Sequence, residues 1–425
     1  MHVRDRGFYR LTPLKDALKR LLPGIKPAES EVVHLEQALG RVLAEDVVAE
    51  RDSPPFDRAA MDGFAVKGEN TFGAAEGNPI YFRVVGEVLT GGSFEGEVGE
   101  FEAVRITTGA PMPPGTNAVV MLEHVNELGD EIEVLKAVPP GKNVSLRGED
   151  YRRGELLLRR GRMVQPQEVA ILASLGIRKV EVFRKPRVGI ISTGDEVVEP
   201  GEELGAGQVY DVNSFALAAL CSATGAEPVR MGIVRDDYEE IRRAIKRTRN
   251  VDVLLISGAT SVGKRDVVPE VVEELGRVVV HGIAMRPGEP SGFGYVGDVL
   301  VFMLPGYPVA SIVGFEALVR PALQVMLGMP PEMPYPAVRA KMGRKIASKL
   351  GRRDFVRVRV RATDTGLEAV PIRTSGSGIV SSLVRGDGLV IVPENTEGVE
   401  RGETVEVRLF RPVELFSLFN TGPEK

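Results

Sequence analysis

Hydroxyl, glycine and acidic residues gather directly after a short apolar run at residues 253–256. A strand that ends in such a loop and then starts a helix can surround an anion with hydroxyls, backbone N–H groups and a helix dipole. The groups in question are Ser257, Gly258, Thr260, Ser261 and Gly263. Asp266 would repel a bare anion but suits a metal ion that arrives with one. The segment therefore predicts an anion site, with an ordinary glycine-containing turn as the alternative.

The elements around this loop alternate between apolar strands and helices over residues 185–330. Such alternation predicts a doubly wound, mostly parallel α/β sheet, in which ligands bind beyond the carboxyl ends of the strands. Four groups that are distant in sequence fall at these ends: residues 193–196, 236–237, 257–266 and 305–308. Because the carboxyl ends of parallel strands share one edge, this convergence favours the anion site over the simple turn.

The rest of the chain predicts a multidomain α/β protein with two small β-domains and a helical and extended linker domain. Strands with a period of two indicate an inserted β-domain at residues 53–156 and a C-terminal, β-barrel-like domain at 331–425. Residues 1–52 and 157–184 are expected to form the elongated N-terminal linker domain. After Phe355, valine and arginine alternate at residues 356–361, where a solvated arginine face is favoured over an anion-binding strip.

Composition narrows the classes of function. The 425 residues carry a formal net charge of −5, which gives no reason to expect a nucleic-acid partner. The single cysteine, Cys221, lies in an apolar stretch that predicts a packed, inert thiol. Four histidines and one cysteine do not provide the spacing of a zinc or iron–sulfur site. We expect a cytoplasmic protein without a membrane span, because no apolar run reaches roughly 18 residues and the N-terminus lacks a signal-peptide pattern.

Six motifs in this order resemble the molybdopterin molybdenumtransferases, the family that includes the E-domain of gephyrin. They are AMDGFA at residues 60–65, TGAP at 108–111, GED at 148–150, STGDE at 192–196, SGATSVG at 257–263 and LPGYPV at 304–309. Taken alone, the Asp62-Gly63 pair predicts a surface turn, and residues 147–150 predict a solvated turn with a weak ion pair. The resemblance extends over nearly the whole chain and gives these motifs a shared role.

The resemblance implies an elongated homodimer of four-domain subunits whose active site lies in a cleft shared between the chains. It implies that adenylated molybdopterin and molybdate, or tungstate, are converted into molybdenum cofactor with release of AMP, assisted by Mg²⁺. The α/β region, residues 185–330, would be the molybdopterin-binding domain. A molybdopterin adenylyltransferase is the expected upstream partner.

The resemblance also suggests roles for individual residues. Catalytic roles go to Asp62, Asp236, Asp266 and Arg286, and the metal ligands are Glu196 and Asp266. Cofactor binding goes to Thr108, Arg147, Asp150, Ser257, Gly258, Ser261, Gly263, Pro305 and Gly306. Of these, Thr108, Arg147 and Asp150 would reach in from the partner subunit.

The chain departs from the family pattern at four positions. Arg286 replaces a common Lys, Glu289 lies where a second Lys is frequent, Ala259 replaces a usual Gly, and Tyr307 replaces a frequent Asn. These differences leave the preferred oxyanion open. Two other functions remain as alternatives: adenylyl transfer to molybdopterin, by proteins that share only the α/β domain, and a non-catalytic scaffold.

Overall fold

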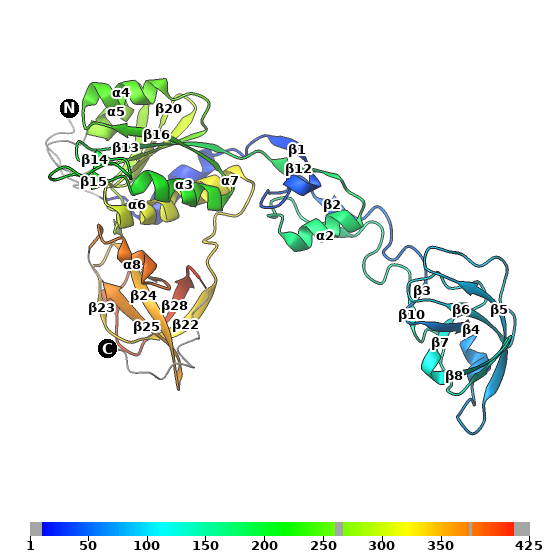
Figure 1. The fold of residues 1–425 in the computed structure, drawn as a ribbon. Helices are drawn as coiled ribbons and strands as arrows, with labels where there is room; N and C mark the ends of the chain where they lie inside the picture. The colour runs from blue at the N-terminus through cyan, green and yellow to red at the C-terminus, as the bar shows by residue number, and fades with distance from the viewer. Residues whose placement is uncertain (1–10, 260–266, 374–375, 412–425) are drawn as a thin grey trace. The chain divides into compact units, whose positions relative to one another are not determined.

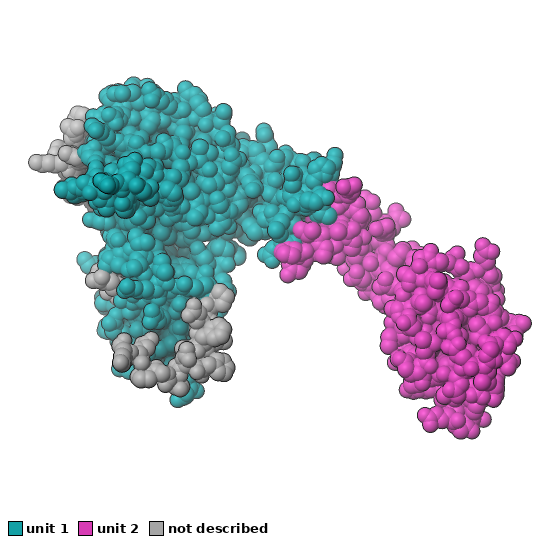
Figure 2. All heavy atoms as spheres, viewed as in Figure 1, with its two compact units in different colours: residues 1–44, 161–165, 179–425 teal, residues 45–160, 166–178 magenta. Residues whose placement is uncertain are grey.

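The computed structural model describes residues 11–259, 267–373 and 376–411 and divides into two compact units (Figure 2). Unit 1 comprises residues 1–44, 161–165 and 179–425, and unit 2 comprises residues 45–160 and 166–178. Unit 1 contains the α/β domain and the C-terminal β-domain, whereas unit 2 contains the inserted β-domain. We describe each unit by itself.

The α/β domain of unit 1 is built on a six-stranded sheet with the order β16-β13-β17-β21-β20-β18 (Figure 1). The first four strands run parallel, whereas β20 and β18 are antiparallel to their neighbours. In sheet order the strands are β16 (Glu227–Val234), β13 (Arg187–Thr193), β17 (Val253–Ser257), β21 (Val299–Leu304), β20 (Gly292–Val296) and β18 (Arg277–His281). The predicted, mostly parallel sheet is thereby confirmed.

Helices cover both faces of this sheet, because both faces of its central strands are apolar. On β17, Val253 and Leu255 belong to the core beneath α3 and the helix that begins at α6, whereas Leu254 and Ile256 belong to the core beneath α4 and α5. The helices are α3 (Asn213–Thr224), α4 (Tyr238–Arg247), α5 (Val267–Leu275) and α6 (Pro308–Gly314). Figure 1 shows α4 and α5 on one side of the sheet and α3 with α6 on the other, which is the doubly wound arrangement.

The helix that closes the domain continues from α6 through a π-helical stretch, η6 (Phe315–Val319), into α7 (Arg320–Met326). Over Pro308–Met326 it is long and apolar enough to cross a membrane by length and composition, although Glu316 and Arg320 interrupt its apolar residues. However, 78% of its apolar window is buried within the protein. It is therefore a central core helix, packed against α3 and the sheet.

The C-terminal β-domain closes a ring of five strands through successive pairings of β24, β25, β22, β28 and β26, with β26 returning to β24. The strands are β22 (Ala337–Met342), β24 (Arg353–Thr363), β25 (Gly366–Arg373), β26 (Gly388–Val392) and β28 (Thr404–Leu409). A short strand of the α/β domain, β19 (Met285–Arg286), pairs in parallel with the start of β24. The backbone of one domain thus continues the sheet of the other.

Unit 1 also contains the N-terminal helix α1 (Leu14–Leu21), whose Leu14, Ala17 and Leu21 join the core of the α/β domain. After it, β1 (Ser30–His34) pairs antiparallel with β12 (Lys179–Phe183). These two strands lie on either side of the inserted segment in sequence. Their pairing explains how the chain leaves unit 1 and returns to it.

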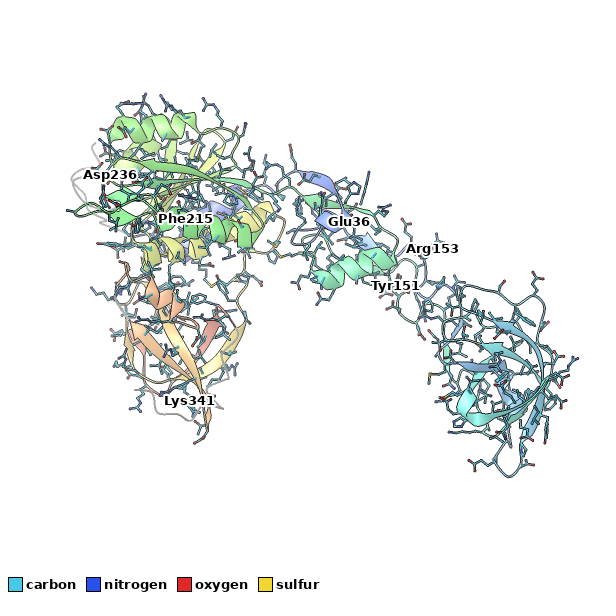
Figure 3. The ribbon with its side chains drawn as sticks, in the orientation of Figure 1. Glu36, Tyr151, Arg153, Phe215, Asp236 and Lys341 are labelled. Atoms are coloured by element: carbon cyan, nitrogen blue, oxygen red, sulfur yellow. The ribbon has the colours of Figure 1, made fainter. Side chains whose placement is uncertain are left out.

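Unit 2 is organised around a six-stranded sheet with the order β7-β4-β6-β5-β9-β8. Its strands are β4 (Gly63–Val66), β5 (Ile80–Val88), β6 (Glu102–Ile106), β7 (Ala118–Met121), β8 (Val125–Leu128) and β9 (Glu131–Val134). The unit also holds α2 (Pro166–Ser174) and the antiparallel pair β2 (Val47–Val48) and β11 (Leu156–Leu158). In Figure 3, Tyr151 and Arg153 lie near α2.

Candidate active site

The carboxyl ends of the parallel strands meet at a cavity of about 1250 Å³ in unit 1. Ser192 of β13, Ser257 of β17 and Leu304 of β21 lie level with one another in the sheet register. The structure brings all four predicted groups to this cavity, lined by Thr193, Glu196, Asp236, Ser257, Gly258, Pro305 and Gly306. Asp236 is labelled in Figure 3. Of the predicted site residues in this region, Ser261, Gly263 and Asp266 lie outside the described residues.

Glycine at position 258 allows two strand ends to come close together. A Cβ atom on Gly258 would lie 2.3 Å from the Thr193 carbonyl oxygen and 2.5 Å from its hydroxyl oxygen, and the residue has a φ of +117°. The backbone N–H of Gly258 donates to the carbonyl of Leu304 at 3.0 Å. Ala259, which follows, has a φ of 45°, in the left-handed region where a side chain is unfavourable. The floor of the cavity therefore depends on backbone that a side chain at position 258 would displace.

Asn213, at the start of α3, joins two strand-end loops and was missed by the sequence analysis. Its side-chain amide donates to the hydroxyl of Ser257 at 2.8 Å and to the carbonyl of Gly306 at 2.7 Å. The Ser257 hydroxyl lies 3.2 Å from the carbonyl of Pro305. These partners are 44 and 93 residues from Asn213 in sequence. No local pattern could have indicated this contact, because both partners lie in distant loops.

A buried carboxylate, Asp211, supports the same wall of the cavity. It is 2% exposed and accepts hydrogen bonds from the Ser192 hydroxyl at 2.8 Å and from the Ser214 backbone N–H and hydroxyl at 3.0 and 2.5 Å. Arg230 lies 3.7 Å from Asp211, donates to Ser214, and stacks over the Phe215 ring at 3.6 Å (Phe215 is labelled in Figure 3). Hydrogen bonds and a nearby cation thus fix the position of this carboxylate at the start of α3.

Two arginines from different domains lie close together at the cavity without carboxylate partners among the described residues. Arg286 is on β19 and Arg357 is on β24, and the two strands pair so that Arg286 is opposite Asp354. Arg357 is 3% exposed, and its Nε and one Nη have no hydrogen-bond partner. Burial, followed by the charge of Arg286, lowers the pKa of Arg357. Two neighbouring cations, one of them buried and unpartnered, form a site that an anion would complete.

The solvated arginine face predicted for this strand is therefore wrong at Arg357 and right at Arg359 and Arg361, which are exposed. All three alternate with valines on the same strand. The start of β24 pairs with β19, and Arg357 reaches the cavity beside it, whereas the arginine side chains farther along the strand face solvent. Alternation predicts which side chains share a face but does not predict what covers that face.

Carboxylates line the cavity as well. Arg352 donates to Asp354 at 2.8 and 3.2 Å, so this pair is already neutralised. Glu196, Asp236 and Glu289 also line the cavity. Across the part of the chain that the structure describes, no group of three or more His, Cys, Asp or Glu side chains could hold a metal ion. Of the two predicted metal ligands, Glu196 is at the cavity and Asp266 lies outside the described residues.

The predicted site residues of the inserted β-domain lie in unit 2. Asp62 accepts hydrogen bonds from the Thr108 backbone N–H at 2.6 Å and from its hydroxyl at 2.9 Å, and these bonds lower the pKa of Asp62. Asp62, on the bend that leads into the buried strand β4, thus orients Thr108. A Cβ on Gly63 would lie 2.0 Å from the Val120 carbonyl, so this glycine serves strand contact and not the predicted turn.

The second predicted group of unit 2 forms a surface ion pair, as the local sequence suggests. Arg147 donates from its Nε to Asp52 at 2.6 Å, and its backbone N–H donates to Asp57 at 2.7 Å. Asp150 accepts from the Ser53 hydroxyl at 3.3 Å. These contacts fix the loop and leave the Arg147 side chain 66% exposed.

Known protein families match this chain over most of its length. Three family profiles match the chain in succession: the MoeA N-terminal region (domain I and II) at residues 12–176, a probable molybdopterin binding domain at 189–325, and the MoeA C-terminal region (domain IV) at 339–410. The cavity is lined by residues of the second and third matched regions.

Similar proteins cover nearly the full length of the chain. A putative molybdopterin biosynthesis protein of Methanocaldococcus jannaschii is 42% identical over 94% of this chain and 98% of its own. The molybdopterin molybdenumtransferase of Bacillus subtilis is 37% identical over 94% of each. A crystal structure of the molybdopterin biosynthesis MoeA protein from Pyrococcus horikoshii OT3 matches with a TM-score of 0.82 and 40% identity, over 94% of this chain and all of that one. The chain therefore belongs to the MoeA family of molybdopterin molybdenumtransferases, as the six motifs predicted.

Proposed function

We propose that the chain is a molybdopterin molybdenumtransferase, which inserts molybdate or tungstate into adenylated molybdopterin and releases AMP during molybdenum cofactor biosynthesis. The observation that carries this proposal is the pair Arg286 and Arg357 at the cavity, because it is a cationic site without a counterion among the described residues. A tetrahedral dianion would give the guanidinium nitrogens of Arg357 the acceptors that they lack. The relatives from Bacillus subtilis and Staphylococcus aureus, which carry this activity in their names, support the proposal.

The residues around the arginines have separate tasks in this proposal. Arg286 and Arg357 hold the oxyanion, and the Ser257 hydroxyl, fixed by Asn213, orients it. Gly258 and Gly306, which line the cavity without side chains, would lie beside the diphosphate of the adenylated pterin. Since the two substrates would share one cavity, the oxyanion would lie beside the diphosphate bond that breaks when AMP is released.

Mg²⁺ is a further part of the proposal. Glu196 lines the cavity and is a hard oxygen ligand of the type that Mg²⁺ prefers, with Asp266 as the second predicted ligand. Asp236, which lines the same cavity, would arrange water or the pterin. When bound with the diphosphate, the ion would neutralise charge on the phosphate oxygens.

The homodimer and its shared active site are also proposed. The Asp62–Thr108 pair and exposed Arg147 of unit 2 would serve the cavity of a second copy. Mixing two inactive variants tests this: Asp62→Ala in unit 2 and Arg357→Ala in unit 1. We expect mixed dimers to regain activity, because one of their two sites has no substitution. Mixtures that stay inactive despite subunit exchange would contradict a shared site.

The proposed pathway context is a molybdopterin adenylyltransferase acting upstream, in the cytoplasm. Adenylyl transfer by this chain itself, or a purely scaffolding role, is not favoured, because the likeness to the transferases covers both β-regions as well as the α/β domain. The deciding experiment supplies adenylated molybdopterin with each oxyanion and measures AMP. We expect AMP release that depends on molybdate or tungstate. Formation of adenylated molybdopterin from ATP and molybdopterin instead would identify an adenylyltransferase.

A further inference from the structure

An exposed aromatic ring lies at the cavity and has no role in the account above. Tyr307 lines the cavity, and its side chain is 65% exposed. Its hydroxyl makes no hydrogen bond to any residue within the described ranges. An exposed aromatic ring beside a cavity offers an apolar face that a ligand ring can cover.

The backbone around Tyr307 is held in place on both sides. Tyr307 is the N-cap residue of α6, between Gly306 and Pro308, and its carbonyl accepts from the Ser311 backbone N–H at 2.9 Å. The next turn is tied to the C-terminal domain, because the Val309 N–H donates to the carbonyl of Ser377 at 2.9 Å. Because the backbone on both sides of Tyr307 is fixed, the ring would lose less conformational entropy when a ligand binds.

One edge of the ring lies against a glycine. A Cβ atom on Gly378 would lie 3.3 Å from Cδ1 of Tyr307 and 3.7 Å from Cε1. The loop of the C-terminal domain therefore supports the ring with backbone alone. An added side chain at position 378 would press directly on the ring.

We propose that Tyr307 is a stacking platform for a planar heteroaromatic ring of the substrate, either adenine or pterin. This inference rests on the proposed function, since adenylated molybdopterin carries both ring systems. The cavity, about 1250 Å³, exceeds the size of roughly 300–1000 Å³ that holds a drug-sized ligand. It therefore has room for a ring beside Tyr307 in addition to an oxyanion beside Arg357. An aromatic side chain accepts any base on its face, so the contact needs no hydrogen bond from the tyrosine hydroxyl.

Calorimetric titration with three probes tests the inference: AMP, neopterin and ribose 5-phosphate, which lacks an aromatic ring. Three variants are compared with the unsubstituted protein: Tyr307→Ala, Tyr307→Phe and Tyr307→Leu. Base stacking on an aromatic side chain predicts a loss of roughly 5- to 150-fold in affinity for the ring that occupies the platform in Tyr307→Ala. Tyr307→Phe should keep that affinity within about twofold, since the hydroxyl has no partner. Tyr307→Leu, which keeps apolar bulk without a ring, should resemble Tyr307→Ala.

Each outcome has a defined reading. A selective loss for AMP assigns the platform to adenine, and a selective loss for neopterin assigns it to pterin. Unchanged affinity for both, undetectable binding of both by the unsubstituted protein, or an equal loss for ribose 5-phosphate would overturn the inference. Circular dichroism and light scattering show whether the fold and the oligomeric state of each variant are unchanged. An affinity loss that is explained by a change in oligomeric state alone would also overturn the inference. AMP release by the unsubstituted protein separates the two levels: its absence refutes the proposed function, whereas normal release with an unchanged KM for adenylated molybdopterin in Tyr307→Ala refutes only the platform.

Discussion

Replacing Arg357 with methionine should separate binding of the oxyanion from stability of the fold. Arg357 is 3% exposed and has two guanidinium nitrogens without partners, so the ligand-free protein carries a buried, uncompensated charge. Desolvation of a single buried ion costs several kcal/mol when no partner offsets it, and an apolar side chain of similar volume removes that cost. We therefore expect Arg357→Met to melt at or above the temperature of the unsubstituted protein.

The same change should strongly weaken the reaction. A hydrogen bond from a charged donor contributes about 1.5–3 kcal/mol. Because about 1.4 kcal/mol corresponds to a factor of ten, loss of one such bond lowers kcat/KM for molybdate at least roughly tenfold. Loss of bonds from both nitrogens lowers it at least about 100-fold. The assay follows AMP release while molybdate is varied at saturating adenylated molybdopterin.

Arg359→Met is the matched control, because it changes the same residue type two positions along β24, where the side chain is exposed. It should alter kcat/KM for molybdate less than about twofold, as expected for a surface charge. Equal losses in both variants would show that charge on this strand acts at long range. An unaffected Arg357→Met enzyme, or one that loses activity only because it unfolds, would refute the proposed oxyanion site.

Three further predictions concern the framework of the cavity. Gly258→Ala should destabilise the protein more than Gly201→Ala in urea denaturation. Both glycines have a positive φ, but only a Cβ at position 258 would meet backbone, 2.3 Å from the Thr193 carbonyl oxygen. Similar losses of stability in the two variants would mean that backbone strain alone matters. Asp211→Asn should lower the free energy of unfolding by about 1–3 kcal/mol, because Asp211 accepts three hydrogen bonds in a buried site. Glu199→Gln, which changes a partly exposed partner of Arg230, should lower the free energy of unfolding by less than about 1 kcal/mol. A larger loss of stability in Glu199→Gln than in Asp211→Asn would show that the important charge is at Glu199. Burial raises the pKa of the Cys221 thiol from 9.0 to about 12, so the folded protein favours the neutral thiol. That contribution to stability is complete below pH 9.0 and is lost as pH rises through about 12. Iodoacetamide should therefore leave Cys221 unlabelled at pH 8 until urea unfolds the chain, and the decline of stability at alkaline pH should be shallower in Cys221→Ala.

The α/β architecture and the meeting of its strand-end loops could be predicted from sequence, because both follow from local periodicity. Apolar residues on both faces of β17 indicate a strand between two layers of helices, and parallel strands must present their carboxyl ends at one edge. The antiparallel strand β20 was missed because two of its five residues are glycine, which weakens any strand pattern.

The parts of the site that sequence did not reveal depend on long-range contacts. Asn213 acts through partners in two distant loops, and Asp211 acts by fixing Ser192 and Ser214. Arg357 belongs to an alternating row, and only the pairing of β24 with β19 distinguishes it from the solvated Arg359. Local patterns contain none of this information, because each contact joins elements whose order in space is set by the whole fold.

Anomalous diffraction from crystals grown with tungstate locates the oxyanion most directly. We expect a single strong tungsten peak per chain, within hydrogen-bonding distance of the guanidinium groups of Arg286 and Arg357, and its disappearance in crystals of Arg357→Met. A tungsten peak elsewhere in the chain, or one that persists unchanged in Arg357→Met, would contradict the assignment of these two arginines as the oxyanion site.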